Sequence, residues 1–411
     1  MNATHVHELH LADGQRVSRQ RRDTGARLSH ALLSYLVLLI ALVTLVPYEF
    51  AVPDQLTPSL VVDPLGIAGM AALFVPYGFL SRRARTGRVG GHVMVIALTA
   101  ALLAASLEVA QLFERASHAS PWHILAATAG AAAGAVTCAR VHAGQRTAAG
   151  ALQAMLLQLP LMALTYLLLP LLWISAAVAE DAPSRLLLTI SAALAGASLL
   201  GSIARAVRPH TPDRPWWSVP LIATVWGALG MAPALLVDWR YGVVGIGLVT
   251  ALASWRGRWN APPFVERRYE APSLLAAAPF LLVYIVGAGL WPGNVFRSYP
   301  LVTLGMPVAD TGLLLVLPIV EMGITATVLG YVTAEFHGRI GASLREIGPR
   351  ILLQVAVVVL MLECARSVFG FEGASVLRAG LSLGTAAFGA ALYHLQRSHI
   401  VVVARRFNGA G

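Results

Sequence analysis

The feature that most constrains this chain is a series of apolar stretches, each long enough to cross a membrane, that recurs from residue 30 to residue 395. A helix needs about 20 mostly apolar residues to span the hydrocarbon core of a bilayer. Only 12 % of the residues are Asp, Glu, Lys or Arg, which is about half the share of a soluble protein. That charge cannot cover a soluble surface for 411 residues, so the sequence predicts an all-α, polytopic integral membrane helical bundle.

Counting these stretches gives the number of transmembrane helices. We expect about 12 transmembrane helices, at residues 30–50, 61–80, 91–112, 121–141, 152–178, 186–204, 216–237, 241–255, 272–292, 310–334, 350–369 and 376–395. The stretch 241–255 is short and rich in glycine, and the sequence leaves open whether it spans fully.

The distribution of arginine sets the orientation, because the chain contains no lysine. If the N-terminus is cytoplasmic and the loops alternate, most of the 30 arginines fall on the cytoplasmic side, as in the loop with Arg82, Arg83 and Arg85. Cytoplasmic loops carry the excess of positive residues in membrane proteins. We therefore expect both termini in the cytoplasm. Arginine in short loop clusters, with no continuous basic face, also excludes a nucleic-acid partner.

Cysteine and histidine give no sign of a metal or redox centre. Cys138 and Cys364 lie in or beside apolar stretches without a metal-binding spacing, so we interpret them as packing residues. His5, His7 and His10 lie in a polar terminal segment that offers no rigid element to present them. We predict no metal site and no cofactor.

An internal similarity links the two ends of the bundle. Leu-Glu-Val-Ala-Gln at residues 107–111 aligns with Leu-Glu-Cys-Ala-Arg at 362–366, and the alignment continues through Ala119–Ser120 and Ala374–Ser375. We therefore divide the chain into a basic cytoplasmic segment (1–29), a four-helix unit (30–142), a middle four-helix section (150–260), a degenerate second copy of the first unit (271–396) and a cytoplasmic tail (397–411).

The first unit resembles the VanZ-like family of small membrane proteins. The matching residues are Pro47-Tyr48, the segment Leu73-Phe74-Val75-Pro76-Tyr77-Gly78-Phe79, Glu108, Gln111, Ser120, Gly130 and Gly134. The chain departs from the family pattern at three polar positions, where it has Met70, His123 and Ala127. The resemblance implies a protein of the bacterial cell envelope, in the inner membrane, with a role such as glycopeptide-antibiotic resistance or polysaccharide handling.

A polar cluster is predicted where the third and fourth stretches meet. A carboxylate inside a transmembrane helix is costly, so Glu108 needs a partner or a function. Gln111 and Arg115 follow on the same helix face, and the short loop brings Ser120 and His123 to the same corner. The cluster is interpreted either as a network that locks the hairpin, with Glu108 paired to Arg115, or as a site for a polar head group in the outer leaflet.

The second copy carries corresponding candidates at Glu363, Arg366, Ser375 and Arg378. A third carboxylate, Glu321, lies in the stretch 310–334 with no basic residue beside it. We consider it either protonated or paired with Arg366 or Arg378 from another helix, and a candidate for ion coupling. Two pairs of glycines spaced four residues apart, Gly130/Gly134 and Gly380/Gly384, form a pattern that permits close contact between helices.

Three functions remain open at this stage. The first is binding or processing of a lipid-linked or cell-wall glycan component at the outer leaflet, with membrane lipids as the other partner. The second is proton-coupled secondary transport through Glu321, and the third is a non-catalytic scaffold for envelope-polysaccharide assembly. No catalytic residue is assigned, and the sequence decides neither the oligomeric state nor whether a reaction takes place.

Overall fold

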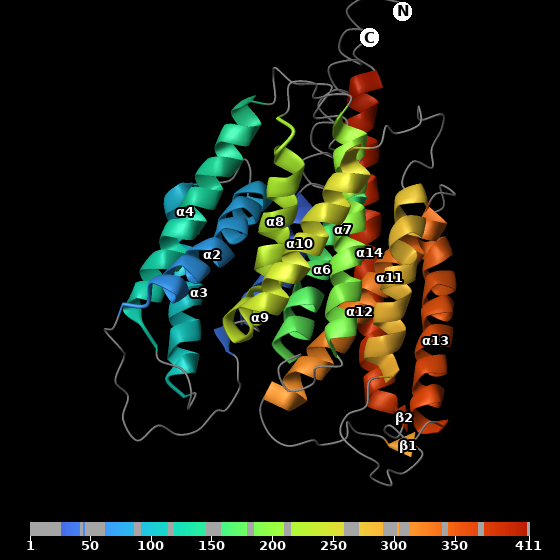
Figure 1. Ribbon diagram of the computed structural model, residues 1–411. Helices are drawn as coiled ribbons and strands as arrows, with labels where there is room; N and C mark the ends of the chain where they lie inside the picture. Colours follow the sequence, from blue (N-terminus) through green and yellow to red (C-terminus); the bar gives the residue numbers. More distant parts are fainter. Residues whose placement is uncertain are drawn as a thin grey trace, which may run out of the picture. The chain divides into compact units, whose positions relative to one another are not determined.

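The protein is all-α, as predicted (Figure 1). The computed structural model describes residues 26–41, 44–45, 62–85, 92–113, 119–144, 158–178, 185–208, 215–258, 271–290, 302–303, 313–338, 344–368 and 374–408. The chain forms two compact units. Unit 1 comprises residues 1–149, 310–316 and 395–411, and unit 2 comprises residues 150–309 and 317–394. The predicted middle section and most of the second copy thus lie in the same unit.

The helices follow the apolar stretches of the sequence. After a first helix, Ala26–Ala41, they are α2 (Pro64–Ala84), α3 (Val93–Gln111), α4 (Pro121–Gly144), α6 (Leu159–Val178), α7 (Leu186–Val207), α8 (Ser218–Gly230), α9 (Ala232–Val237), α10 (Trp239–Arg258), α11 (Ala271–Leu290), α12 (Leu313–Gly338), α13 (Leu344–Val368) and α14 (Val376–Asn408). Each of the 12 predicted stretches overlaps one of these helices, except that the seventh contains two.

Seven helices in the described part of the chain are long and apolar enough to cross a membrane, so the protein is a membrane protein. They are α3, α4, α7, α11, α12, α13 and α14. The seventh predicted stretch is not one continuous helix, because it breaks at Met231 between α8 and α9. Pro233, at the start of α9, has no N–H to donate and its ring disfavours an uninterrupted helix.

In unit 1, α2 and α4 pack backbone against backbone. A Cβ at Gly78 would fall on the carbonyl of Ala131, and a Cβ at Gly134 would fall on the carbonyl of Val75. Only glycine fits such a crossing, and the predicted contact at Gly134 is confirmed. The corresponding prediction for Gly380 and Gly384 is wrong, because a Cβ at either would meet nothing within 4 Å.

Helix α3 completes the described core of unit 1 by packing one narrow face against α4. The buried residues of that face are Ile96, Ala100, Ala104, Leu107 and Glu108, spaced three or four residues apart. The other faces are apolar but exposed, as at Met94, Leu98 and Leu102. An apolar surface of this kind is what a helix presents to lipid. Glu108 is therefore turned inward, away from the lipid-facing side.

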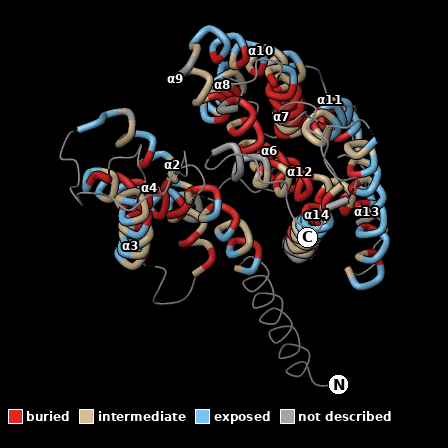
Figure 2. Tube along the Cα trace, turned by 90° about the horizontal axis from the view of Figure 1, so that it is seen from below, coloured by how far each residue is buried: buried red, intermediate tan, exposed pale blue. Residues whose placement is uncertain are grey.

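In unit 2, α7 is the central helix and packs against α6, α10 and α11 (Figure 2). It is rich in small residues. In its most apolar stretch of 18 residues, 67 % are buried, against 22 % in the corresponding stretch of α13. Gly196 faces the ring of Trp226, and Gly201 faces the backbone of Ala253. Small side chains on α7 thus let three neighbours approach closely.

A pair of two-residue strands joins two loops of unit 2. Strand β1 (Val302–Thr303) lies parallel to β2 (Ala374–Ser375), with Val302 opposite Ala374 and Thr303 opposite Ser375. Since β2 runs directly into α14, this pairing holds the first residues of that helix in place. The same residues form part of a polar site in the second copy.

Candidate functional site

The first site consists of Glu108, Ser120 and His123, at the corner where α3 ends and α4 begins. The backbone N–H of Ser120 donates a hydrogen bond to Glu108 Oε2 at 2.6 Å. Nδ1 of His123 lies 3.0 Å from Glu108 Oε1, and it must carry the proton because a carboxylate only accepts. The carboxylate therefore sits at the N-terminus of α4, where the helix dipole favours negative charge.

The second ring nitrogen of His123, Nε2, lies near the first turn of α2. His123 Nε2 is 2.9 Å, and Asp63 Oδ2 2.5 Å, from the position that a Cβ would take at Gly66. Asp63 also caps α2 by accepting the N–H of Gly66 at 3.0 Å. The imidazole thus lies between two acidic side chains. The sequence prediction missed Asp63, although an Asp directly before Pro64 is a typical start of a helix.

Two buried polar atoms beside the first site have no hydrogen-bond partner in the described structure. They are Ser120 Oγ and Gln111 Oε1, and Ser120 is only 6 % exposed. Gln111 uses its Nε2 to donate to the carbonyl of Thr44, at the end of the first helix, at 2.6 Å. Buried polar atoms are normally paired, so an unpaired hydroxyl next to a carboxylate is a candidate contact for a bound group.

The predicted members of this cluster therefore divide into three groups. Glu108, Ser120 and His123 come together, and Gln111 is directed to the first helix instead. Arg115 lies outside the described residues, so its predicted pairing with Glu108 stays a prediction. His123 now supplies the contact to Glu108 Oε1.

The second site consists of Glu363, Ser375 and Arg378 and has the same construction. The backbone N–H of Ser375 donates to Glu363 Oε2 at 2.9 Å, and the two residues are 12 apart in the chain, as Ser120 and Glu108 are. Arg378 takes the place of His123, at the same separation of 15 residues from its carboxylate. Its Nε and Nη2 donate to the two carboxylate oxygens, each at 2.7 Å.

The helices around the two sites also match. Arg366 donates through Nε to the carbonyl of Gly289 at the end of α11, as Gln111 donates to Thr44 at the end of the first helix. A Cβ at Gly389 would fall on the carbonyl of Thr327, and the same relationship links Gly134 and Val75. Helices α12, α13 and α14 thus repeat the local contacts of α2, α3 and α4.

The charge around the second site differs from that around the first. Glu363 is bridged by Arg378 and, at 3.5 Å, by Arg366 one turn along α13. Both basic candidates of the second copy therefore contact Glu363, and the carboxylate is fully neutralised by the chain itself. This is a closed ion-pair network that locks the loop between α13 and α14.

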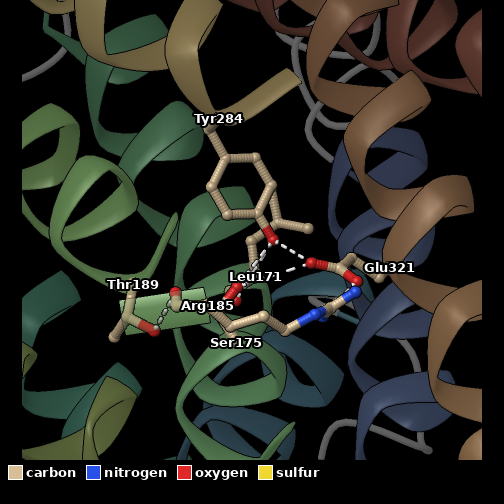
Figure 3. Close-up of polar contacts among 6 residues, drawn as sticks. All are labelled: Leu171, Ser175, Arg185, Thr189, Tyr284 and Glu321. Atoms are coloured by element: carbon tan, nitrogen blue, oxygen red, sulfur yellow. Dashed lines mark hydrogen bonds and ion pairs between the residues drawn. The ribbon is translucent and has the colours of Figure 1, made fainter. Parts of the chain in front are cut away.

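A third polar cluster surrounds Glu321 in the interior of unit 2 (Figure 3). Oε2 of Glu321 accepts from Nη1 of Arg185 at 2.8 Å, and Oε1 accepts from the hydroxyl of Tyr284 at 2.7 Å. Ser175 Oγ lies 3.0 Å from the Tyr284 hydroxyl and 3.4 Å from Glu321 Oε1. All four residues are buried.

The predicted partners of Glu321 were wrong. Arg378 is engaged by Glu363, and Arg366 lies beside the same carboxylate, whereas Arg185 at the start of α7 reaches Glu321. Arg185 was not among the predicted site residues. Its position directly before an apolar stretch was the only signal that it lies at a helix end.

No set of three His, Cys, Asp or Glu residues in the described ranges is arranged to hold a metal ion. His5, His7 and His10 lie outside those ranges. Cys138 is buried and Cys364 exposed, and neither forms a disulfide.

Comparison with known proteins adds nothing to the geometry. No family model matches the chain, and neither a curated protein nor a solved structure matches it. The fold, the two matching sites and the Glu321 cluster are therefore the observations on which a function can be built.

Proposed function

We propose that this is a VanZ-like membrane protein of the bacterial inner membrane whose first site binds the polar head group of a lipid-linked or cell-wall glycan component at the outer leaflet. The observation that carries the proposal is the contrast between two sites of the same construction. The second site is closed by two arginines, whereas the Ser120 hydroxyl in the first site is buried and has no partner among the residues that the structure describes.

The groups of the first site suit recognition of a polyhydroxylated head group. Glu108 accepts hydrogen bonds, the Ser120 hydroxyl can donate or accept, and His123 carries a second ring nitrogen toward Asp63. The His123 side chain is 19 % exposed, so a head group at the membrane surface can reach it. The same groups also support proton transfer, since a carboxylate and an imidazole in contact are a common acid–base pair.

The orientation supports the same location. The positive-inside distribution of arginine puts the loop between α3 and α4 outside the cytoplasm. A site at that end of α3 faces the leaflet in which lipid-linked glycan components are exported and used. Exposed Trp122, next to His123, is a residue type enriched at the membrane interface.

The carrier alternative receives less support from the structure. A coupling carboxylate must gain and lose a proton, but Glu321 is held by Arg185, Tyr284 and Ser175 together. The cluster therefore fits an internal ion pair that joins α6, α7, α11 and α12.

Binding of a lipid-linked disaccharide precursor tests the proposal. The full-length protein in lipid nanodiscs would be titrated with the precursor, and binding would be measured by native mass spectrometry. We expect E108Q to lose binding at least about tenfold, which corresponds to about 1.4 kcal/mol. The matched variant E363Q, in the second site, should bind as the wild type does.

Stability must be followed in the same preparations, because E108Q alters a buried contact. Equal thermal stability of the wild type and E108Q together with lost binding would support a binding site. Undiminished binding by a stable E108Q would contradict the proposal.

A further inference from the structure

The two sites share a backbone arrangement but carry opposite charge. In the second site one carboxylate, Glu363, is surrounded by the guanidinium groups of Arg366 and Arg378. In the first site, Glu108 has the imidazole of His123, which is charged only when protonated, and Asp63 adds a second carboxylate nearby. The described residues thus make the second site net positive and the first site net negative, whether or not His123 is protonated.

The second site shows what the first one lacks. The guanidinium of Arg378 donates to both oxygens of Glu363, and its backbone N–H donates to Ser375 Oγ at 3.2 Å. Every acceptor of that site is therefore occupied. In the first site, Glu108 Oε2 receives only the N–H of Ser120, and the Ser120 hydroxyl has no partner among the described residues.

Among the described residues, Glu108 has no partner with a permanent positive charge, so we consider a positively charged group with several N–H donors as the missing component. A buried carboxylate is expensive without a cation, and Glu108 is only 5 % exposed. A neutral hydroxyl would satisfy an acceptor but leave the charge uncompensated. A primary ammonium supplies both the charge and three donors, enough for Glu108 Oε2, Ser120 Oγ and one further acceptor.

The exposed fractions of the side chains also differ between the two sites. The side chains of Arg378 and Glu363 are 8 % and 9 % exposed, so the second site is closed. The His123 side chain is 19 % exposed, and the adjacent Trp122 is 40 % exposed. The Glu108 side chain is 6 % exposed, so the His123 ring is the part of the first site that a group at the surface can reach.

We propose that the first site recognises a protonated primary amino group on the glycan component, and that Arg378 occupies the equivalent place in the second site as a permanent internal substitute. This inference rests on the proposed function and specifies the chemical group that is recognised. It predicts that acetylation of the amine, which removes the charge and two donors, abolishes recognition.

The test compares one precursor in two chemical states. The full-length protein would be placed in phosphatidylglycerol nanodiscs, which contain no amine. It would then be titrated with a lipid-linked disaccharide peptide that carries a free lysine amine, and with the same molecule after N-acetylation. We expect the acetylated form to bind at least about tenfold more weakly. Phosphatidylethanolamine would be added as a competitor, to show whether a phospholipid amine serves as well.

A substitution that imitates the second site provides the internal control. H123R should place a guanidinium on Glu108 and abolish binding of the free amine, while thermal stability stays at or above that of the wild type. R378K keeps the positive charge of the second site and should leave the preference for the free amine unchanged.

The outcomes separate the two proposals. Equal binding of the free and acetylated precursors would overturn amine recognition and leave glycan binding in place. Binding of neither form would overturn both. Full displacement by phosphatidylethanolamine would support amine recognition but overturn the glycan as its source. Retained binding by a stable H123R would also overturn amine recognition at this site.

Discussion

Arg185 and Glu321 form a buried ion pair, 2.8 Å between Nη1 and Oε2, that ties the start of α7 to the middle of α12. Tyr284 from α11 and Ser175 from α6 complete the contact (Figure 3). Four helices of unit 2 are thereby joined at one point inside the core. Replacing both partners of a buried ion pair lowers the stability of a protein less than removing one partner and leaving the other charge buried.

Loss of one partner should therefore be strongly destabilising. R185A would leave Glu321 buried without its cation, and we expect a loss of about 3–5 kcal/mol. Y284F removes the hydroxyl that contacts both Glu321 and Ser175 and should cost about 1–3 kcal/mol. Thermal unfolding in detergent, followed by intrinsic fluorescence, measures both. Exposed Arg240 supplies the control, since R240A should behave as the wild type. An R185A protein as stable as the wild type would contradict the structural role of the pair.

The crossing of α2 and α4 gives a second prediction. A methyl group at Gly134 would collide with the backbone of Val75, so G134A should force the helices apart and cost about 1–3 kcal/mol or more. The control is G380A, because no described atom lies within 4 Å of the new methyl group. It should be neutral or slightly stabilising, since alanine favours helix more than glycine does. Equal effects of the two substitutions on thermal stability would refute the close crossing.

The two sites should differ in their contribution to stability. R378A removes a doubly hydrogen-bonded cation from buried Glu363, and we expect a loss of about 3–5 kcal/mol. H123A removes a single contact to Glu108, from a more exposed position, and should cost about 1–3 kcal/mol. Unfolding midpoints of the two variants make the comparison. A larger loss for H123A would mean that the first site is the structural lock.

The orientation can be tested with single cysteines in a protein that lacks Cys138 and Cys364. Trp122 and Leu377 are exposed at the starts of α4 and α14. W122C and L377C should both react with a membrane-impermeant thiol reagent on intact cells, whereas R85C should react only after permeabilisation. Labelling of only one of W122C and L377C would show that the two sites face opposite sides of the membrane.

The apolar stretches predicted the helices well because the length and hydrophobicity that a bilayer demands are visible in the sequence. The contact between Glu108 and the start of α4 could also be predicted from the sequence, because a short loop brings the ends of two successive helices together. The repeated Leu-Glu motif likewise pointed to both buried carboxylates, Glu108 and Glu363.

Contacts between distant helices were not visible in the sequence. Arg185 lies 136 residues before Glu321, and no local periodicity connects the two. The pattern Gly380-x-x-x-Gly384 predicted a helix crossing that the structure makes instead at Gly330 and Gly389. Spacing alone shows that two glycines share a helix face, but the neighbour that this face meets depends on the tertiary packing.

Photocrosslinking at the first site tests the central claim most directly. A photoreactive phenylalanine derivative would replace Trp122 beside His123, or Leu377 beside Arg378 as the matched control, in the full-length protein in living bacterial cells. Both positions are exposed, so both probes can reach lipid. Mass spectrometry of the irradiated protein should find a glycan-bearing lipid on the Trp122 probe and only phospholipid on the Leu377 probe. The same phospholipid adducts at both positions, without a glycan-bearing lipid, would contradict the claim.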